Sequence, residues 1–147
     1  MKVLVTGATG YIGSHVCKQL KERGHCVEGW DINIHDEYND VSDYVDSFNA
    51  VDVTDVPYTY CEFDAVVHLA GRSVVPDSLK EPTEYYRVNA MGTAHMLDKV
   101  KTDNFIFAGI TIHAISRQAR ALCHCMKCAC LKGAANFGEG CENRGIG

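Results

Sequence analysis

The chain has 147 residues, of which 46% are hydrophobic and 22% charged, and its formal net charge is −5. This composition predicts a soluble globular domain with enough apolar side chains for a core, and its acidity argues against a nucleic-acid partner, which requires a basic face. No apolar run approaches the roughly 18 residues needed to cross a bilayer, and the first residues are already typical of a strand, so we expect neither a membrane span nor a cleaved secretory signal.

The chain begins with the pattern of a strand, a glycine-rich turn and an amphipathic helix. Residues 2–6 form a short apolar run that ends at Gly7. From residue 11 onward, apolar side chains recur at helical spacing and predict the buried face of a helix: Ile12, Val16 and Leu20. Gly24 follows as the expected stop signal of this helix.

Four further strands and one helix are expected downstream. A second strand covers residues 26–30, and a third lies around residues 49–53, after an acidic loop. Residues 63–69 are almost continuously apolar, as in a central parallel strand, and residues 104–108 form the fifth strand. Between them, a helix begins at Pro82, and its apolar positions continue to Val100: Tyr85, Val88, Gly92, Met96 and Val100. This order predicts an α/β fold, a Rossmann-like doubly wound parallel sheet of strand order 3-2-1-4-5.

Gly7, Gly10 and Gly13 form a G-x-x-G-x-x-G motif between the first strand and the first helix. The first glycine permits a tight turn, the second lets the backbone approach a pyrophosphate, and the third lets the helix pack closely. The helix start behind them offers N–H groups and a partial positive charge to a diphosphate. The motif therefore predicts a dinucleotide site, and the alternative is a structural turn that binds nothing.

Asp31 stands at the end of the second strand, where a carboxylate can accept both hydroxyls of an adenosine ribose. The same carboxylate repels a 2′-phosphate, and no Arg accompanies it in residues 32–35. The sequence therefore favours NAD over NADP as the cofactor. The alternative is an exposed loop aspartate without a ligand.

Several separated motifs carry a family likeness over residues 1–108. They are VTGATGYIGSHVCKQL, the aspartate after the second strand, DVTD from Asp52, VVHLAG from Val66 and PTEYYRVNAMGT from Pro82. Together they resemble the N-terminal half of the NAD-dependent epimerase/dehydratase family, the extended short-chain dehydrogenases/reductases that act on nucleotide sugars and are typified by UDP-glucose 4-epimerase.

The resemblance implies a set of cofactor contacts. Gly7, Gly10, Tyr11 and Ile12 would line the pyrophosphate, Asp31 and Ile32 the adenosine ribose, Asp52 and Val53 the adenine, and Leu69, Ala70 and Gly71 the nicotinamide side, with Asn89 beneath the cofactor. Strand order agrees in part, because the end of the fourth strand lies beside the first at the crevice where ligands bind. Ser73 stands where many of these epimerases carry a ribose-binding lysine. His68 lies inside an apolar strand, so we expect a hydrogen-bonded core histidine in preference to a catalytic one.

The composition changes near Gly109. Residues 1–108 carry a net charge of −8 and residues 109–147 one of +3, and the second part holds five of the eight cysteines. The family's catalytic Tyr-x-x-x-Lys is missing, since the last tyrosine is Tyr86. A reading-frame shift, a fusion or cloning junction, and an adapted short tail are the three explanations. No catalytic residue is assigned.

Residues 123–130 spell C-x-C-x-x-C-x-C, which superficially suggests a metal site. The same stretch has helical periodicity from residue 115 to residue 131, and on a helix these thiols cannot converge on one ion. We therefore favour a helix and assign no metal. Because nothing in the sequence points to export, we expect the cysteines to be reduced thiols and the protein to be cytoplasmic.

These expectations combine into one hypothesis. Residues 1–108 form an NAD-binding Rossmann-type domain, truncated and without catalysis by itself, and residues 109–147 form an atypical helical tail packed on it. The fifth strand, left at the sheet edge, predicts a homodimer whose interface includes residues from the 105–131 range. The alternatives are a short NAD-dependent enzyme that completes its active site through a partner chain, and an interaction module with an empty cofactor site.

Overall fold

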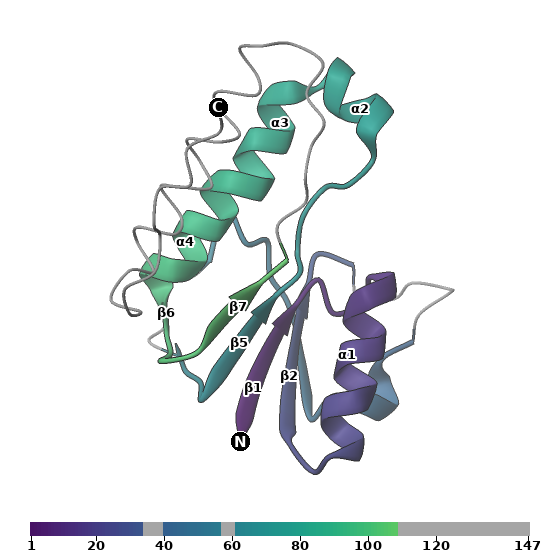
Figure 1. Ribbon diagram of the computed structural model, residues 1–147, viewed down its shortest axis with the longest axis vertical. Helices are drawn as coiled ribbons and strands as arrows, with labels where there is room; N and C mark the ends of the chain where they lie inside the picture. Colours follow the sequence, from purple (N-terminus) through teal and green to yellow (C-terminus); the bar gives the residue numbers. More distant parts are fainter. Residues whose placement is uncertain (34–39, 57–60, 109–147) are drawn as a thin grey trace, which may run out of the picture.

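The computed structural model describes residues 1–33, 40–56 and 61–108, and every structural statement below concerns these residues. Five parallel strands form one sheet in the order β3-β2-β1-β5-β7 (Figure 1). Their bounds are β1 Lys2–Thr6, β2 Cys26–Asp31, β3 Ser47–Ala50, β5 Ala65–His68 and β7 Phe105–Phe107. Since the predicted fourth and fifth strands are β5 and β7, the expected Rossmann-like sheet of order 3-2-1-4-5 is confirmed.

Helices cover both faces of this sheet (Figure 1). Helix α1, Tyr11–Glu22, packs on one face, and a helical segment made of α3, η2 and α4 packs on the other. The bounds of that segment are α3 Pro82–Tyr86, the π-helical turn η2 Arg87–Met91 and α4 Gly92–Lys99. Two shorter helices, η1 Ser42–Tyr44 and α2 Val75–Lys80, lie in the connections. No helix in the described ranges is long and apolar enough to span a membrane.

The core is divided into two apolar clusters, one on each face of the sheet. Leu4 belongs to the cluster that contains Met96 of α4, whereas Val3 and Val5 belong to the cluster that contains Cys17 of α1. Successive strand residues point to opposite faces, so one short apolar strand supplies both clusters. This double burial explains why the three central positions of β1, Val3, Leu4 and Val5, are all apolar.

Helix α1 packs two of the three predicted residues, Val16 and Leu20, against the core cluster that contains Cys17, but the third, Ile12, is exposed. Its buried residues are Gly13, Ser14 and Cys17, while Ile12 is 60% exposed. Gly13 packs tightly on the preceding turn, since a Cβ on Gly13 would lie 1.9 Å from the carbonyl oxygen of Gly7. Ile12 lies in the first turn of the helix, beyond the part of the stripe that contacts the core.

Two further boundaries differ from the predictions. The third strand is Ser47–Ala50 and not residues 49–53, because the Asp52 side chain accepts hydrogen bonds from Thr54 and begins a turn there. The helix that begins at Pro82 ends at Lys99, and Val100–Lys101 forms the short strand β6, which pairs with β4, Cys61–Glu62. No pattern in the sequence indicated this second, two-stranded sheet.

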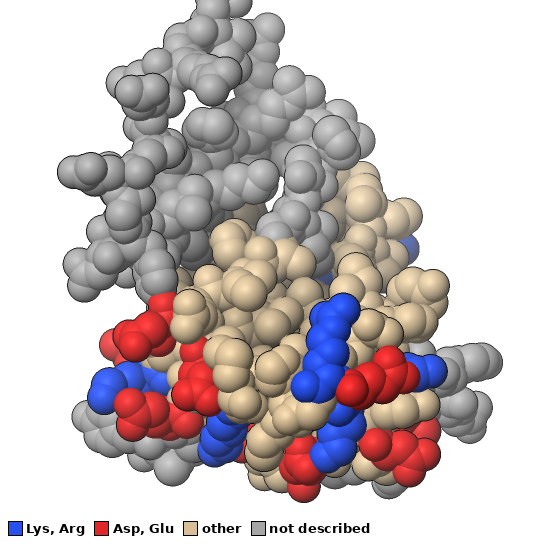
Figure 2. All heavy atoms as spheres, turned by 60° about the horizontal axis from the view of Figure 1, so that its bottom comes forward, with Lys and Arg blue, Asp and Glu red and all other residues tan. Residues whose placement is uncertain are grey.

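Figure 2 shows the end of the molecule at which β1 begins, where acidic and basic side chains alternate. Lys2 pairs with Glu28 at 3.5 Å, and Lys101 pairs with Glu62 at 3.2 Å. The Lys101–Glu62 pair is exposed on both sides, so it contributes little to stability. The predicted tail helix over residues 115–131 and the cysteines of residues 123–130 lie outside the described residues.

Candidate functional site

The glycine-rich turn joins β1 to α1 at the carboxyl end of the sheet. Gly7 has a φ of +69°, and a Cβ there would lie 2.7 Å from the amide nitrogen of Ala70. The amide of Gly7 donates to the carbonyl of Trp30 at 2.8 Å, and the amide of Gly10 donates to the carbonyl of Gly7 at 3.1 Å. Only glycine combines this backbone conformation with such close packing, so the turn brings the start of α1 directly beside the loop that follows β5.

Helix α1 begins at Tyr11 without a side-chain cap, because its N-cap residue is Gly10. The first turn of any α-helix leaves N–H groups without intrahelical acceptors, and here no acidic side chain lies in that turn. The side chains of Tyr11 and Ile12 are mostly exposed. The helix start therefore presents its backbone dipole to an anionic ligand.

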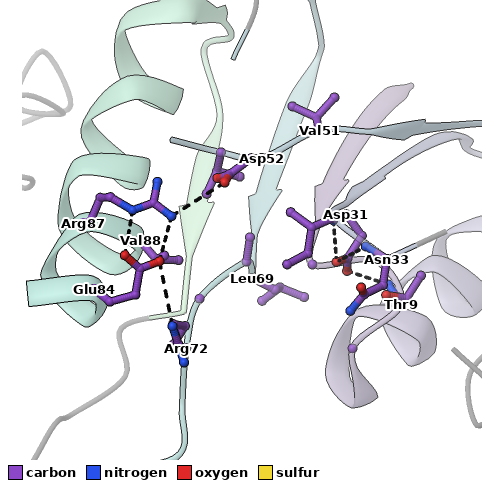
Figure 3. Close-up of a pocket in the computed structure, with 16 residues that line it drawn as sticks. Thr9, Asp31, Asn33, Val51, Asp52, Leu69, Arg72, Glu84, Arg87 and Val88 are labelled. Carbon is purple, nitrogen blue, oxygen red and sulfur yellow. Dashed lines mark hydrogen bonds and ion pairs between the residues drawn. The ribbon is translucent and has the colours of Figure 1, made fainter. Parts of the chain in front are cut away.

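Asp31 ends β2 beside this turn, and its carboxylate connects the two (Figure 3). One carboxylate oxygen, Oδ2, accepts from the amide of Thr9 at 3.1 Å. The other, Oδ1, accepts from the amides of Ile32 and Asn33 at 2.8 and 3.4 Å. These backbone bonds fix the orientation of the carboxylate, and Oδ2, which accepts a single bond, keeps a further lone pair for a ligand hydroxyl.

A cleft of about 380 Å³ lies across the carboxyl ends of the strands. Nine of the twelve residues predicted as cofactor contacts line it: Gly7, Gly10, Asp31, Ile32, Asp52, Val53, Leu69, Ala70 and Gly71. The other three are Tyr11, Ile12 and Asn89, which do not line the cleft. Asn89 instead uses its side-chain amide on the backbone of Arg72, as donor at 3.0 Å and as acceptor at 2.8 Å.

Asp52 lies in the cleft wall that follows β3. Its Oδ1 accepts from both the amide and the hydroxyl of Thr54, each at 2.8 Å. Partial burial acts to raise the pKa of Asp52, but the bonds from Thr54 and the charge of Arg87 outweigh it and leave the pKa below its usual value. Asp52 therefore presents an ionised acceptor to the cleft.

The cleft is also lined by three charged residues that the sequence analysis did not predict: Arg72, Glu84 and Arg87 (Figure 3). Arg87 holds Glu84 in a two-point contact at 2.7 and 2.9 Å, and it also donates to the hydroxyl of Thr54. The bonds from Arg87 lower the pKa of Glu84 and raise that of the guanidinium. The spacing of Glu84 and Arg87 by three residues on a helix was the available signal.

His68 is buried in β5 and fully hydrogen-bonded. Its Nδ1 lies 2.7 Å from the hydroxyl of Thr6, and its Nε2 lies 3.1 Å from the hydroxyl of Thr93. Burial lowers the pKa of His68 to about 4, so the imidazole is neutral at physiological pH. The predicted core histidine is thus confirmed. His68 is also absent from the cleft lining, whereas the neighbouring Leu69 belongs to it.

Comparison with known proteins identifies relatives of this arrangement. The family model for the NAD dependent epimerase/dehydratase family matches residues 3–119. A UDP-glucose 4-epimerase of Klebsiella pneumoniae is 34% identical over 124 residues, which are 74% of this chain and 88% of that protein. The human UDP-glucose 4-epimerase is 33% identical over 128 residues, which are 73% of this chain and 36% of that protein.

Solved structures with a similar fold are also UDP-glucose 4-epimerases. A UDP-glucose 4-epimerase from Stenotrophomonas maltophila, with bound NAD and formylated UDP-arabinopyranose, superimposes with a TM-score of 0.61 at 30% identity. The match covers 73% of this chain and 36% of that one. The Thermus thermophilus UDP-glucose 4-epimerase in complex with NAD gives a TM-score of 0.55 at 29% identity, covering 67% of this chain and 33% of that one. The chain thus spans about a third of these two structures.

Proposed function

The chain belongs to the NAD-dependent epimerase/dehydratase family, and from this premise we propose that its cleft binds NAD. The observation that carries the proposal is a convergence of three features in one cleft. These are the glycine-rich turn, the uncapped start of α1 and the backbone-anchored carboxylate of Asp31. The first two suit a diphosphate and the third suits a ribose diol, which are the adjoining parts of a dinucleotide.

The cofactor would lie along the carboxyl ends of the strands. Its pyrophosphate would contact the backbone of Gly7, Gly10 and the first turn of α1, where Tyr11 and Ile12 contribute amides and not side chains. Its adenosine would lie toward Asp31 and Ile32, with the adenine beside Asp52 and Val53. Its nicotinamide would lie toward Leu69, Ala70 and Gly71. Asn89 would act through the backbone of Arg72, to which its amide is bonded.

The experiment is calorimetric titration of the full chain with NAD and with NADP. Wild type should prefer NAD, because the Asp31 carboxylate accepts the ribose hydroxyls and repels a 2′-phosphate. Asp31→Ala should weaken NAD by about tenfold or more and NADP far less. Asp43→Ala removes the same charge from an exposed turn and should leave both affinities unchanged. Equal affinity of wild type for the two cofactors would remove Asp31 from the site.

We further propose that the chain binds the cofactor of a nucleotide-sugar epimerase or dehydratase without catalysis by itself. General acid–base catalysis needs a positioned proton donor or acceptor. The family's Tyr-x-x-x-Lys pair does not occur after Tyr86, and His68, which directly precedes a cleft residue, is neutral and enclosed by two threonines. Turnover by the purified chain would favour an active site completed by a partner chain.

The remaining proposals concern organisation. Residues 1–108 would form the cofactor-binding domain, residues 109–147 would pack on it, and the protein would be a cytoplasmic homodimer. Within the described part of the chain, β7 pairs with β5 on one side alone, and its Ile106 is 60% exposed. A parallel strand with an open edge and an exposed apolar residue favours pairing with a second copy.

A further inference from the structure

A chain of buried hydrogen bonds crosses the molecule from β1 through β5 to the helical segment on the far face. Thr6, His68 and Thr93 provide it, and each is at most 4% exposed. The hydroxyl of Thr6 lies 2.7 Å from Nδ1 of His68, and Nε2 of His68 lies 3.1 Å from the hydroxyl of Thr93. Three elements far apart in the sequence are therefore joined by polar contacts inside an otherwise apolar region.

Both ends of this chain reach the same segment of the cleft, residues 69–72. At one end, the amide of Ala70 donates to the hydroxyl oxygen of Thr6 at 3.2 Å. At the other end, the hydroxyl of Thr93 donates to the carbonyl of Asn89 at 2.7 Å, and the Asn89 side chain bonds both the amide and the carbonyl of Arg72. The backbone that lines the cleft after β5 is thus held at two points.

The hydrogen bonds determine the tautomer of His68. The hydroxyl of Thr93 donates its proton to the carbonyl of Asn89, so toward His68 it can only act as an acceptor. Nε2 of His68 must therefore carry a hydrogen. Nδ1 is then the acceptor of the Thr6 proton, and the Thr6 oxygen remains free to accept from Ala70. With this neutral Nε2–H tautomer every member of the chain is satisfied, whereas a proton on Nδ1 would leave the Thr6 hydroxyl without an acceptor.

The helix departs from α geometry at the point where it meets this chain. Residues Arg87–Met91 form a π-helical turn, and Asn89 lies in its middle. Turns of this kind inside helices occur frequently at functional sites, where they redirect a side chain. Within this turn, the carbonyl of Asn89 accepts from Thr93, and the side-chain amide of Asn89 bonds the backbone of Arg72.

We propose that Thr6, His68, Thr93 and Asn89 form a positioning relay that holds residues 69–72 in the course required by the nicotinamide half of a dinucleotide. The inference rests on the proposed binding of NAD. The strand order is the reason for assigning the relay to the nicotinamide half of the ligand. β5 and β2 lie on opposite sides of β1, so residues 69–72 and Asp31 border opposite ends of the cleft. Disturbing the relay therefore weakens contacts to the nicotinamide riboside and leaves those to the adenosine in place.

The binding test compares two ligands on the full chain by calorimetry. ADP carries the adenosine and both phosphates but lacks the nicotinamide riboside. Thr93→Val keeps the shape of the side chain, removes the acceptor of His68 and should weaken NAD by about tenfold while changing ADP by less than about twofold. Thr93→Ser restores the hydroxyl and should restore NAD affinity. Ser78→Ala is the matched control, since it removes a buried hydroxyl from α2 outside the relay.

A second measurement does not depend on ligand or on the folding of a variant. Nitrogen-detected NMR of the imidazoles in wild type should show His68 protonated at Nε2 and unprotonated at Nδ1 at neutral pH. A proton on Nδ1, or a charged ring, overturns the relay. Equal losses of NAD and ADP in Thr93→Val overturn its assignment to the nicotinamide half. A wild-type chain that binds neither ligand refutes the proposed function itself, which distinguishes that failure from failure of the relay.

Discussion

Lowering the pH from 7 to 5 should destabilise this protein through His68. The ring lies between two threonine hydroxyls and beside the ring of Phe105, at 5.8 Å between centroids. No carboxylate in the described part of the chain contacts it. Burial lowers the pKa of His68 from 6.5 to about 4. Protonation would place a hydrogen on Nδ1, which would then face the hydrogen that the Thr6 hydroxyl donates. The native state therefore disfavours the charged ring.

The direction and size of the effect follow from proton linkage. Above pH 6.5 the imidazole is neutral in both states, and its contribution to stability is fully present. As the pH falls below 6.5, the unfolded chain binds a proton that the native chain excludes until about pH 4, so the free energy of unfolding falls. One pKa unit corresponds to about 1.4 kcal/mol, so the full loss is about 3 kcal/mol, of which about 2 kcal/mol falls between pH 7 and pH 5.

Urea unfolding of wild type and His68→Gln at the two pH values measures this loss. The variant has no titrating ring at position 68, so all other groups cancel in the comparison, and wild type should lose about 2 kcal/mol more than the variant. Asp46, Asp52 and Glu84 also have lowered pKa values, but carboxylates with lowered pKa values lose their contribution only below about pH 4.5. Equal losses in the two proteins would refute the assignment of the buried neutral imidazole.

Two further predictions concern activity and assembly. The purified chain, supplied with NAD and UDP-glucose, should convert no sugar nucleotide above a buffer control in a coupled assay, because the sequence lacks the Tyr-x-x-x-Lys pair that supplies acid–base catalysis in this family. Reproducible turnover would contradict this. Light scattering should give twice the 16.2 kDa chain mass, with a shift toward monomer in Ile106→Asp, whose charge would lie on the exposed edge strand; a concentrated wild-type monomer would refute the dimer.

The part of the site that depends on local backbone could be predicted from the sequence. Gly7 needs a positive φ, Gly13 needs contact with that turn, and Asp31 ends the next strand, so residue type and spacing alone indicate their places. Apolar periodicity also predicted the packing of Val16 and Leu20 on the core, but it was wrong for Ile12, which lies in the first turn of α1 and is exposed.

The part that depends on tertiary contacts could not be predicted. From the sequence alone, the charged side chains of Arg72 and Arg87 are expected to face solvent. They line the cleft because the loop after β5 meets the helix that begins at Pro82. The tautomer of His68 likewise depends on Thr6 and Thr93, which the fold brings together from distant positions. The apolar residues around His68 indicate from the sequence that it is buried. Its hydrogen-bond partners follow only from the packing of β1, β5 and α4.

The most direct test of NAD binding in this cleft is an NMR titration of the isotope-labelled full chain with NAD. Saturable shifts are expected at the backbone amides of Gly7, Gly10, Ile32 and Ala70, which border the cleft from three neighbouring strand ends. Amides at the opposite end of the sheet, such as that of Lys2, should not move. The absence of saturable shifts, or shifts confined to residues away from the cleft, would contradict the account.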